Sequence, residues 1–377
     1  MAKYHNHSKA EIQEILRTII DPVVGGLLCD DKSLSMIDVD QDKVSLSLTK
    51  GYPIYHAKNQ IDHAIKQTLS EKLGLNESQV NLSLNLESRI KPHSQNHAVS
   101  AIKNVGNLIA VSSGKGGVGK STVSANIAIA LQQQGARVGL LDADIYGPSQ
   151  PGIFSLTDKP EMKGDLMLPL EKFGIQLMSI GLMIDQDTPM IWRGPMVTQA
   201  LEQMLRKTAW PELDYLILDL PPGTGDVQLT LAQKTPMAGA VVVTTPQDIA
   251  LLDVRKAIKM FEKVEVPIIG IIENMSTHIC SQCQHEEAIF GQGGGEVLAS
   301  EYDVSQLGSI PLDITIRQAI DGGLPTVAKV LEQNDCEPRE KRIAEIYHDI
   351  ALALAGNLAV RKKDYRSLFP NIEISNT

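Results

Sequence analysis

Apolar positions in the first part of the chain recur with two different periods, one helical and one typical of strands. Ile12, Leu16 and Ile19 recur at helical spacing and predict a helix over residues 9–19, which Asp21-Pro22 closes. Two runs of alternating character, LSMIDVD and KVSLSLTKG, predict strands; a second helix follows, and QVNLSLNLES predicts a third strand. The resulting order, α-β-β-α-β, predicts a small α+β domain over residues 1–95.

A polar stretch, SRIKPHSQNHAVSAIKNVGN, follows this unit and has almost no apolar periodicity. Such a composition is typical of a linker between domains. We therefore expect a linker over residues 96–107 and a second domain over residues 108–377.

Short apolar runs alternate with helical segments in the second part. The helical segments include residues 121–133 and 249–263, and a closing helix over residues 339–355 is expected to stop at Gly356. This alternation predicts the α/β class, with a doubly wound, mostly parallel sheet whose ligands bind at the carboxyl ends of its strands. The runs that predict these strands are NLIAVSS, ARVGLLDAD, GIQLMSIG, DYLILDLPP, GAVVVTTP and PIIGIIEN.

Composition and charge exclude some partners. The 377 residues carry a formal net charge of -10, which disfavours electrostatic capture by nucleic acid or by an anionic membrane. The N-terminus lacks the uncharged run of a secretory signal, and the last residues are polar and contain Pro370. We expect a cytoplasmic protein with no nucleic-acid and no membrane partner.

The stretch SSGKGGVGKSTVSAN lies between a predicted strand and a predicted helix and contains two lysines. Gly114, Gly119, Lys120 and Ser121 satisfy G-x-x-x-x-G-K-[ST], in the context that a phosphate-binding loop requires. In such a loop backbone N–H groups surround phosphate oxygens, the lysine reaches the β- and γ-phosphates and the hydroxyl binds Mg²⁺. The expected nucleotide-binding residues here are Gly114, Lys115, Gly116, Gly117, Val118, Gly119, Lys120, Ser121 and Thr122.

Acidic residues follow two of the predicted strands. Asp142 and Asp144 lie in LLDADIYGPS, and Asp219 lies in LILDLPPGTGD. A carboxylate at the position of Asp219 can hold Mg²⁺ through a water, and Asp142 or Asp144 can position the attacking water. We favour Asp144 because it lies further out in its loop.

The segments SGKGGVGKST, LLDADIYGPS, LPPGTGD and IENMS together resemble the deviant Walker A group of nucleotide-dependent dimers, and most closely the Mrp/ApbC-type iron-sulfur cluster carrier ATPases. The resemblance covers about residues 108–325, and the N-terminal unit resembles the small domain of bacterial members. It implies ATP hydrolysis in a homodimer in which Lys115 reaches the nucleotide of the other subunit, as an arginine finger does. It also implies that Asn274 contacts the base.

Cys280 and Cys283 form a C-x-x-C pair in THICSQCQHEEAIFG. Such a turn presents two sulfurs to one metal centre, but zinc and a 4Fe-4S cluster each take four ligands. The residues leave three solutions open: a single-chain zinc site with His278 and His285, a redox pair, or a centre shared by two chains. The resemblance implies the third, with a labile 4Fe-4S cluster at the dimer interface that is passed to apoproteins.

The other two cysteines are not expected to be ligands. The apolar neighbourhood of Cys29, GGLLCDD, predicts a buried free thiol. Cys336, in QNDCEPRE, is expected to be an exposed thiol without a role.

Two other functions fit part of the sequence. A positioning ATPase of the ParA or MinD kind shares the two-lysine loop but acts on DNA or membrane, and it has no use for Cys280 and Cys283. A nucleotide-binding protein with a structural zinc at the C-x-x-C pair is the other alternative. The leading interpretation is an ATP-dependent iron-sulfur cluster carrier with ATP, Mg²⁺ and a 4Fe-4S cluster as ligands. Its expected partners are a second copy of the chain, cluster donors and apo iron-sulfur proteins.

Overall fold

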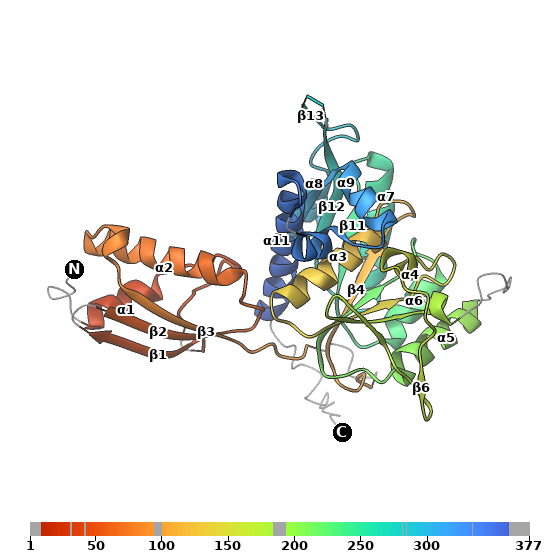
Figure 1. Cartoon of the computed structure of the whole chain (residues 1–377), viewed down its shortest axis with the longest axis horizontal. Coiled ribbons are helices and arrows are strands. Elements are labelled where there is room, and N and C mark those ends of the chain that lie inside the picture. The colour runs from red at the N-terminus through yellow and green to blue at the C-terminus, as the bar shows by residue number, and fades with distance from the viewer. Residues whose placement is uncertain are drawn as a thin grey trace, which may run out of the picture.

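The computed structural model of the chain (Figure 1) describes residues 9–30, 32–40, 43–93, 100–183, 194–280, 282–283, 285–333 and 335–361. The expected boundary at residue 95 and most of the C-terminal segment that carries Pro370 lie outside these residues. The N-terminal part has the predicted α-β-β-α-β order, with one extra 3₁₀ turn. Its elements are α1 (Lys9–Arg17), β1 (Leu34–Asp40), β2 (Lys43–Lys50), α2 (Ala57–Leu73), the 3₁₀ turn η2 (Glu77–Gln79) and β3 (Leu82–Ser88).

One face of this small sheet is covered by the two helices. β2 pairs antiparallel with β1 and parallel with β3. Val44, Leu46 and Leu48 of β2 are buried against the helices, whereas the residues between them are only partly buried. This period of two, facing a helical period in α1 and α2, is what makes the unit fold as two layers.

The segment after β3 is bonded to the side chain of Asn107 in the second part. The amide of Asn107 accepts from the backbone N–H of His93 at 2.8 Å and donates to the carbonyl of Lys91 at 3.1 Å. The first strand of the second part starts at Val105, inside the expected linker. The residues just before the undescribed stretch 94–99 are therefore held close to this strand.

All six predicted strands lie in one nine-stranded sheet with the order β13-β12-β11-β4-β10-β5-β9-β8, where β14 also pairs with β12. The predicted strands pair parallel, as does β14, and only β8 and β13 pair antiparallel. The prediction of a mostly parallel sheet is confirmed. The bounds are β4 (Val105–Ser113), β5 (Val138–Asp142), β8 (Leu170–Lys172), β9 (Ile175–Ser179), β10 (Leu213–Asp219), β11 (Met237–Thr244), β12 (Ile268–Ile279), β13 (Glu286–Glu287) and β14 (Gln306–Leu312), beside a separate pair, β6 (Met162–Lys163) and β7 (Leu166–Met167).

Helices cover both faces of the large sheet, as a doubly wound fold requires. Ile109 and Val111 of β4 pack into a core that includes α3 and α11, whereas Leu108 and Ala110 pack into a second core that includes α5 and α6. The helices are α3 (Lys120–Gln133), α4 (Gln150–Ile153), α5 (Gly194–Lys207), α6 (Asp226–Lys234), α7 (Asp248–Lys263), α8 (Gly294–Glu301), α9 (Ile314–Asp321), α10 (Thr326–Glu332) and α11 (Pro338–Val360), with a 3₁₀ turn η3 (Ile180–Leu182).

The closing helix α11 does not stop at Gly356, so that prediction is wrong. Gly356 lies inside the helix, and a Cβ atom there would come within 2.9 Å of the Val23 and Val24 side chains. The glycine is thus needed for close packing between the two parts of the chain rather than for a helix cap. Among the described residues α11 is the helix that is long and apolar enough to cross a membrane, but more than half of its apolar stretch is buried in the protein.

Candidate functional site: a phosphate-binding loop and a cysteine hairpin

The glycine-rich loop follows β4 and leads into α3. Gly117 and Gly119 have φ angles of 81° and 82°, a conformation that costs other residues free energy. A Cβ atom on Gly114 would lie 2.5 Å from the backbone carbon of Asp253 in α7, so this glycine is required for packing. The loop therefore has the curled backbone that presents N–H groups to phosphate, held against α7 on one side.

Lys120 is paired with Asp219 inside the site. Its Nζ lies 2.6 Å from Asp219 Oδ1, with 6% of the lysine side chain and none of the aspartate exposed. The same oxygen accepts from the Ser124 hydroxyl at 3.0 Å, and Lys120 Nζ lies 3.4 Å from Ser121 Oγ. The predicted phosphate lysine and the two predicted magnesium ligands are thus brought together. Their hard oxygen atoms fit Mg²⁺.

The two aspartates after β5 have different surroundings. Asp142 is fully buried and accepts from the backbone N–H groups of Asp144 and Gln150 and from the Ser179 hydroxyl. Burial and the nearby charge of Asp219 raise the pKa of Asp142 to about 7. Its oxygens are occupied in holding the loop, so Asp142 is poorly placed to position water.

Asp144 lies further out, as expected from its place in the loop. It borders an open cavity of about 670 Å³ together with Tyr146 and residues 221–228. Burial raises the pKa of Asp144, and the charge of Lys120 opposes this effect. Of the two aspartates, Asp144 is the one next to open space near Lys120.

A buried glutamine, which sequence reasoning missed, connects these groups. Gln150 begins α4, and its Nε2 donates to Asp219 Oδ2 at 2.8 Å and to the Ser121 carbonyl at 3.1 Å. The sequence offers little signal for it, because YGPSQP indicates only a turn and a helix start.

Lys115 lies at the edge of the site and points toward α7 of its own chain. Its Nζ donates to Gln247 Oε1 at 3.2 Å, and its carbonyl accepts from the Ser113 hydroxyl at 2.9 Å. Gln247 is the residue before α7 and was not predicted to take part. Lys115 is therefore held within its own chain by one hydrogen bond between half-exposed side chains.

Asn274 braces the loop from β12. Its Nδ2 donates to the Val118 carbonyl at 2.8 Å, and the side chain is almost completely buried. A Cβ atom on Gly119 would lie 2.3 Å from this nitrogen, so glycine is needed there for the asparagine to fit. The role visible in the structure is support of the loop, and the predicted base contact stays a prediction.

The cysteine pair lies at the end of a hairpin that projects from the sheet, where β12 runs into β13 (Figure 1). The Cys280 N–H donates to the His285 carbonyl at 2.9 Å, which closes the turn. Cys283 is exposed and Cys280 partly exposed. Hydrogen bonds from the backbone of Cys283 and Gln282 and from the Cys283 thiol lower the pKa of Cys280, which favours the thiolate that binds metal.

The described residues provide no further metal ligand near this pair. Within those parts of the chain, no group of three or more histidine, cysteine or acidic side chains is arranged to hold a metal ion. His278 Nδ1 lies 3.1 Å from the Leu312 carbonyl, a contact that leaves Nε2 as the nitrogen that could bind a metal. The lack of a grouped ligand set among the described residues, rather than this contact, disfavours the single-chain zinc site with His278 and His285.

The other two cysteines are both buried. Cys29 is buried as predicted, and burial raises its pKa to about 11. Cys336 is also buried, so the prediction of an exposed thiol is wrong. Its Sγ donates to the carbonyls of Lys329 and Gln333 at the C-terminal end of α10.

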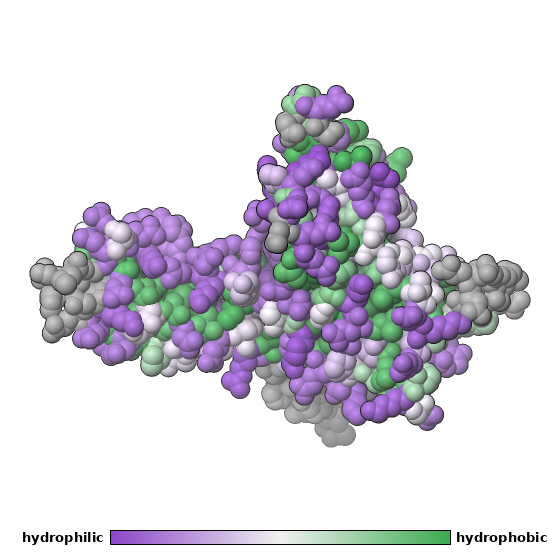
Figure 2. Space-filling view, viewed as in Figure 1, coloured by the Kyte–Doolittle hydropathy of each residue, from purple (hydrophilic) through white to green (hydrophobic). Residues whose placement is uncertain are grey.

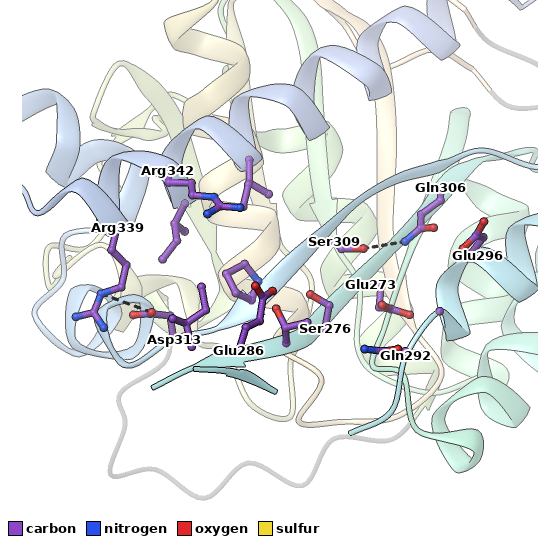
Figure 3. A pocket seen from close by; sticks show the side chains of 16 residues that line it. Glu273, Ser276, Glu286, Gln292, Glu296, Gln306, Ser309, Asp313, Arg339 and Arg342 are labelled. Atoms are coloured by element: carbon purple, nitrogen blue, oxygen red, sulfur yellow. Dashed lines mark hydrogen bonds and ion pairs between the residues drawn. The ribbon is translucent and has the colours of Figure 1, made fainter. Parts of the chain in front are cut away.

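A cavity of about 430 Å³ lies at the root of the hairpin (Figure 3). Arg339 and Arg342 from α11 line one side, and the Arg339 guanidinium lies 3.6 Å from Asp313 Oδ2. Glu286 and Ile279, the latter next to Cys280 in the sequence, line the other. The base of the hairpin therefore borders a hollow lined by both charged and apolar side chains rather than a packed core.

Both parts of the chain match models of known protein families. A model described as NUBPL iron-transfer P-loop NTPase matches residues 104–351, and one described as iron-sulfur cluster assembly protein matches residues 9–82. An iron-sulfur cluster carrier protein of Haemophilus influenzae is 44% identical over 343 residues, or 89% of this chain and 92% of that protein. The iron-sulfur cluster carrier protein of Pseudomonas fragi is 52% identical over 266 residues, or 70% of this chain and 90% of that protein.

A mammalian relative and a solved structure agree with these matches. The iron-sulfur cluster transfer protein NUBPL of Mus musculus is 49% identical over 229 residues, covering 60% of this chain and 72% of that protein. A nucleotide-binding protein from Archaeoglobus fulgidus, in complex with ADP, is 39% identical with a TM-score of 0.52, covering 58% of this chain and 87% of that one. The resemblance of the two-lysine loop is confirmed: the chain belongs to the family of iron-transfer P-loop NTPases.

Proposed function

We propose that this protein is an ATP-dependent iron-sulfur cluster carrier that works as a homodimer. Each chain contributes Cys280 and Cys283, and two chains together supply the four thiolates that a 4Fe-4S cluster takes as cargo. The observation that carries the proposal is the hairpin itself, which exposes two thiols, one with a lowered pKa, and no third ligand among the described residues.

In this proposal, the residues of the nucleotide site exchange hydrogen-bond partners when ATP binds. Lys120 exchanges Asp219 for the β- and γ-phosphates of ATP, while Ser121 and Asp219 hold Mg²⁺. The ion would neutralise charge on the phosphate oxygens. Asp144 orients the attacking water, and Lys115 leaves Gln247 to reach the nucleotide of the partner chain, where its ammonium offsets charge in the transition state.

Exposed apolar side chains support a dimer face beside Lys115. Ile249 and Leu252 on α7 and Val297 on α8 are more than half exposed, and the two helices are in contact. The view in Figure 2 shows hydrophobic residues among hydrophilic ones near the upper end of this part of the molecule, where the hairpin projects. Exposed apolar patches of this kind mark sites of protein–protein interaction.

The remaining assignments complete the proposal. Residues 1–95 form a domain that contacts cluster donors or apo iron-sulfur proteins, joined by a linker to the ATPase domain. The protein works in the cytoplasm and uses neither nucleic acid nor membrane. A ParA- or MinD-type positioning role is disfavoured because the cysteine hairpin has no use there.

The test is anaerobic reconstitution with iron and sulfide, followed by absorbance and a count of iron per chain. We expect about half of a 4Fe-4S cluster per chain in the parent. Cys283→Ser should bind none and should still bind ATP. Cys336→Ala, a change at a buried cysteine outside the hairpin, should bind as much cluster as the parent. One zinc ion per chain in the purified protein, or a full cluster on a monomer, would contradict the proposal.

A further inference from the structure

Gln150 contacts three separate parts of the nucleotide site while being fully buried. Its Nε2 donates to Asp219 Oδ2 at 2.8 Å and to the Ser121 carbonyl at 3.1 Å, and its backbone N–H donates to Asp142 Oδ2 at 3.1 Å. We propose that Gln150 is a positioning residue for magnesium binding, which holds Asp219 and the start of α3 in place when Lys120 turns to the nucleotide. The inference rests on the proposed ATP site and concerns a residue that contacts the magnesium ligands rather than the ion itself.

The first argument is electrostatic. Asp219 and Asp142 are both fully buried, and their negative charges repel each other. Lys120 is the cation that pairs with Asp219 in this structure. When Lys120 moves to phosphate, Asp219 loses that pair, and a buried carboxylate without donors is costly. After Lys120 has moved, Gln150 still donates a hydrogen bond to Oδ2 of Asp219.

The remaining oxygen of Asp219 is also covered, which makes the exchange possible without exposing the carboxylate. Ser124 Oγ, in α3, lies 3.0 Å from Oδ1 and 3.0 Å from the Lys120 backbone carbonyl, so its one hydrogen can go to Asp219, and neither contact uses the Lys120 side chain. One neutral donor per oxygen therefore stays behind. These donors orient the carboxylate but leave its charge for the incoming cation.

The second argument is geometric. One nitrogen of Gln150 bonds both to Asp219 and to the backbone of Ser121, and these two residues carry the oxygens assigned to Mg²⁺. The amide therefore fixes the position of one ligand residue relative to the other. Loss of such outer contacts around metal ligands weakens metal affinity about 10- to 100-fold.

The test variant is Gln150→Met, which keeps the side chain's length and removes its donors. Binding of a fluorescent ADP analogue is measured across a magnesium titration and again in EDTA. We expect the half-saturating Mg²⁺ concentration to rise about tenfold or more. Binding in EDTA should change less than about twofold, because the contacts of the loop glycines and Lys120 with phosphate remain.

Gln134→Met is the matched control. Gln134 is also a buried glutamine, and its Nε2 donates to the His348 carbonyl at 2.9 Å, away from the nucleotide site. This control should shift the midpoint of thermal unfolding but not the magnesium titration. If Gln150→Met does not fold, Gln150→Asn, which keeps the amide but is too short to span both partners, replaces it.

The outcomes separate the two proposals. A Gln150→Met titration that overlays the parent, or an equal shift in Gln134→Met, would overturn the positioning role while leaving the ATP site intact. A parent protein that binds no ADP with or without Mg²⁺ would instead remove the proposed ATP site, and this inference with it.

Discussion

The phosphate-binding loop and the cysteine hairpin are built in opposite ways. At the loop, Lys120, Asp219, Ser124 and Gln150 are buried and bonded to one another within one chain. At the hairpin, Cys283 is exposed and Cys280 partly exposed, and no other metal-binding side chain joins them among the residues the structure describes. The groups of the loop meet within a single chain, whereas the hairpin offers two thiols, which in our proposal are half of a shared centre.

This difference follows from what each centre has to do. A triphosphate and Mg²⁺ can be bound by preformed backbone and oxygen groups, and a buried network keeps those groups oriented. A cluster that is to be passed on needs ligands that another molecule can reach. Lys115 lies between these cases, because it belongs to the loop but is held by a single side-chain contact with Gln247.

The largest expected effect concerns Lys115, the loop residue that we propose acts on the nucleotide of the second chain. Lys115→Ala should lower the rate of ATP hydrolysis about 10³-fold, as loss of an arginine finger does, with ATP affinity changed far less. Lys66→Ala, at a lysine of α2 paired with Asp62 in the N-terminal part, is the matched control and should hydrolyse ATP like the parent.

Mixing two inactive variants tests whether Lys115 acts across the dimer. In a mixed dimer of Lys115→Ala with Lys120→Ala, one nucleotide site has both lysines if Lys115 comes from the partner. With random pairing, about a quarter of the parental rate should return, since half of the dimers are mixed and each has one complete site. No recovery in verified mixed dimers would show that Lys115 acts within its own chain, or not at all.

The next effect compares the stability contributed by the two centres. Asp219→Ala leaves Lys120 buried without its partner, which costs about 3–5 kcal/mol. For a protein of 377 residues, the midpoint of thermal unfolding should fall by about 4–6 °C. Cys283→Ala, at an exposed position, should change it by less than about 2 °C. Equal shifts in the two variants, measured by calorimetry without ligands, would contradict the contrast between a buried network and an exposed hairpin.

The smallest effect concerns the chemistry of the cysteines themselves. Because the pKa of Cys280 is lowered, its thiolate persists as the pH falls below the range of an ordinary thiol, and alkylation should persist with it. Cys29, with a pKa raised to about 11, should react at least about tenfold more slowly at pH 8. Mass spectrometry after timed iodoacetamide treatment of reduced, cluster-free protein measures both rates.

A variant of the partner thiol sharpens this measurement. Cys283→Ala removes the thiol that donates to Cys280, so the pH profile of Cys280 alkylation should move upward. The backbone N–H groups of the turn remain and should keep part of the shift. A profile that does not move would show that the Cys283 thiol does not contribute to the lowered pKa.

Much of the fold follows from local patterns, and the exceptions have identifiable causes. The six apolar runs predict six strands of the sheet because buried parallel strands have apolar residues on both faces. β14 was not predicted, since Gln306, Gly308 and Pro311 interrupt its apolar run. Gly356 resembles a helix stop, but the side chains of Val23 and Val24, far away in the sequence, require a glycine within the helix.

The candidate site likewise contains residues that a local pattern identifies and residues that only the fold brings in. The spacing of the loop motif places Lys120 and Ser121 without knowledge of the fold, because both belong to one short backbone structure. Gln150 could not be found in this way, since its importance comes from Asp219, which is distant along the chain and brought near only when β5 and β10 pair.

The sequence by itself determined the class of fold, the phosphate-binding loop and the presence of a paired-cysteine turn, because each of these depends on residues that are neighbours along the chain. Only the tertiary structure decided that Asp142 holds a loop, that Lys120 is paired with Asp219 and that Cys336 is buried. The reason is physical: burial, ion pairing and pKa depend on which atoms meet in space, and that is settled by the packing of strands and helices far apart in the sequence.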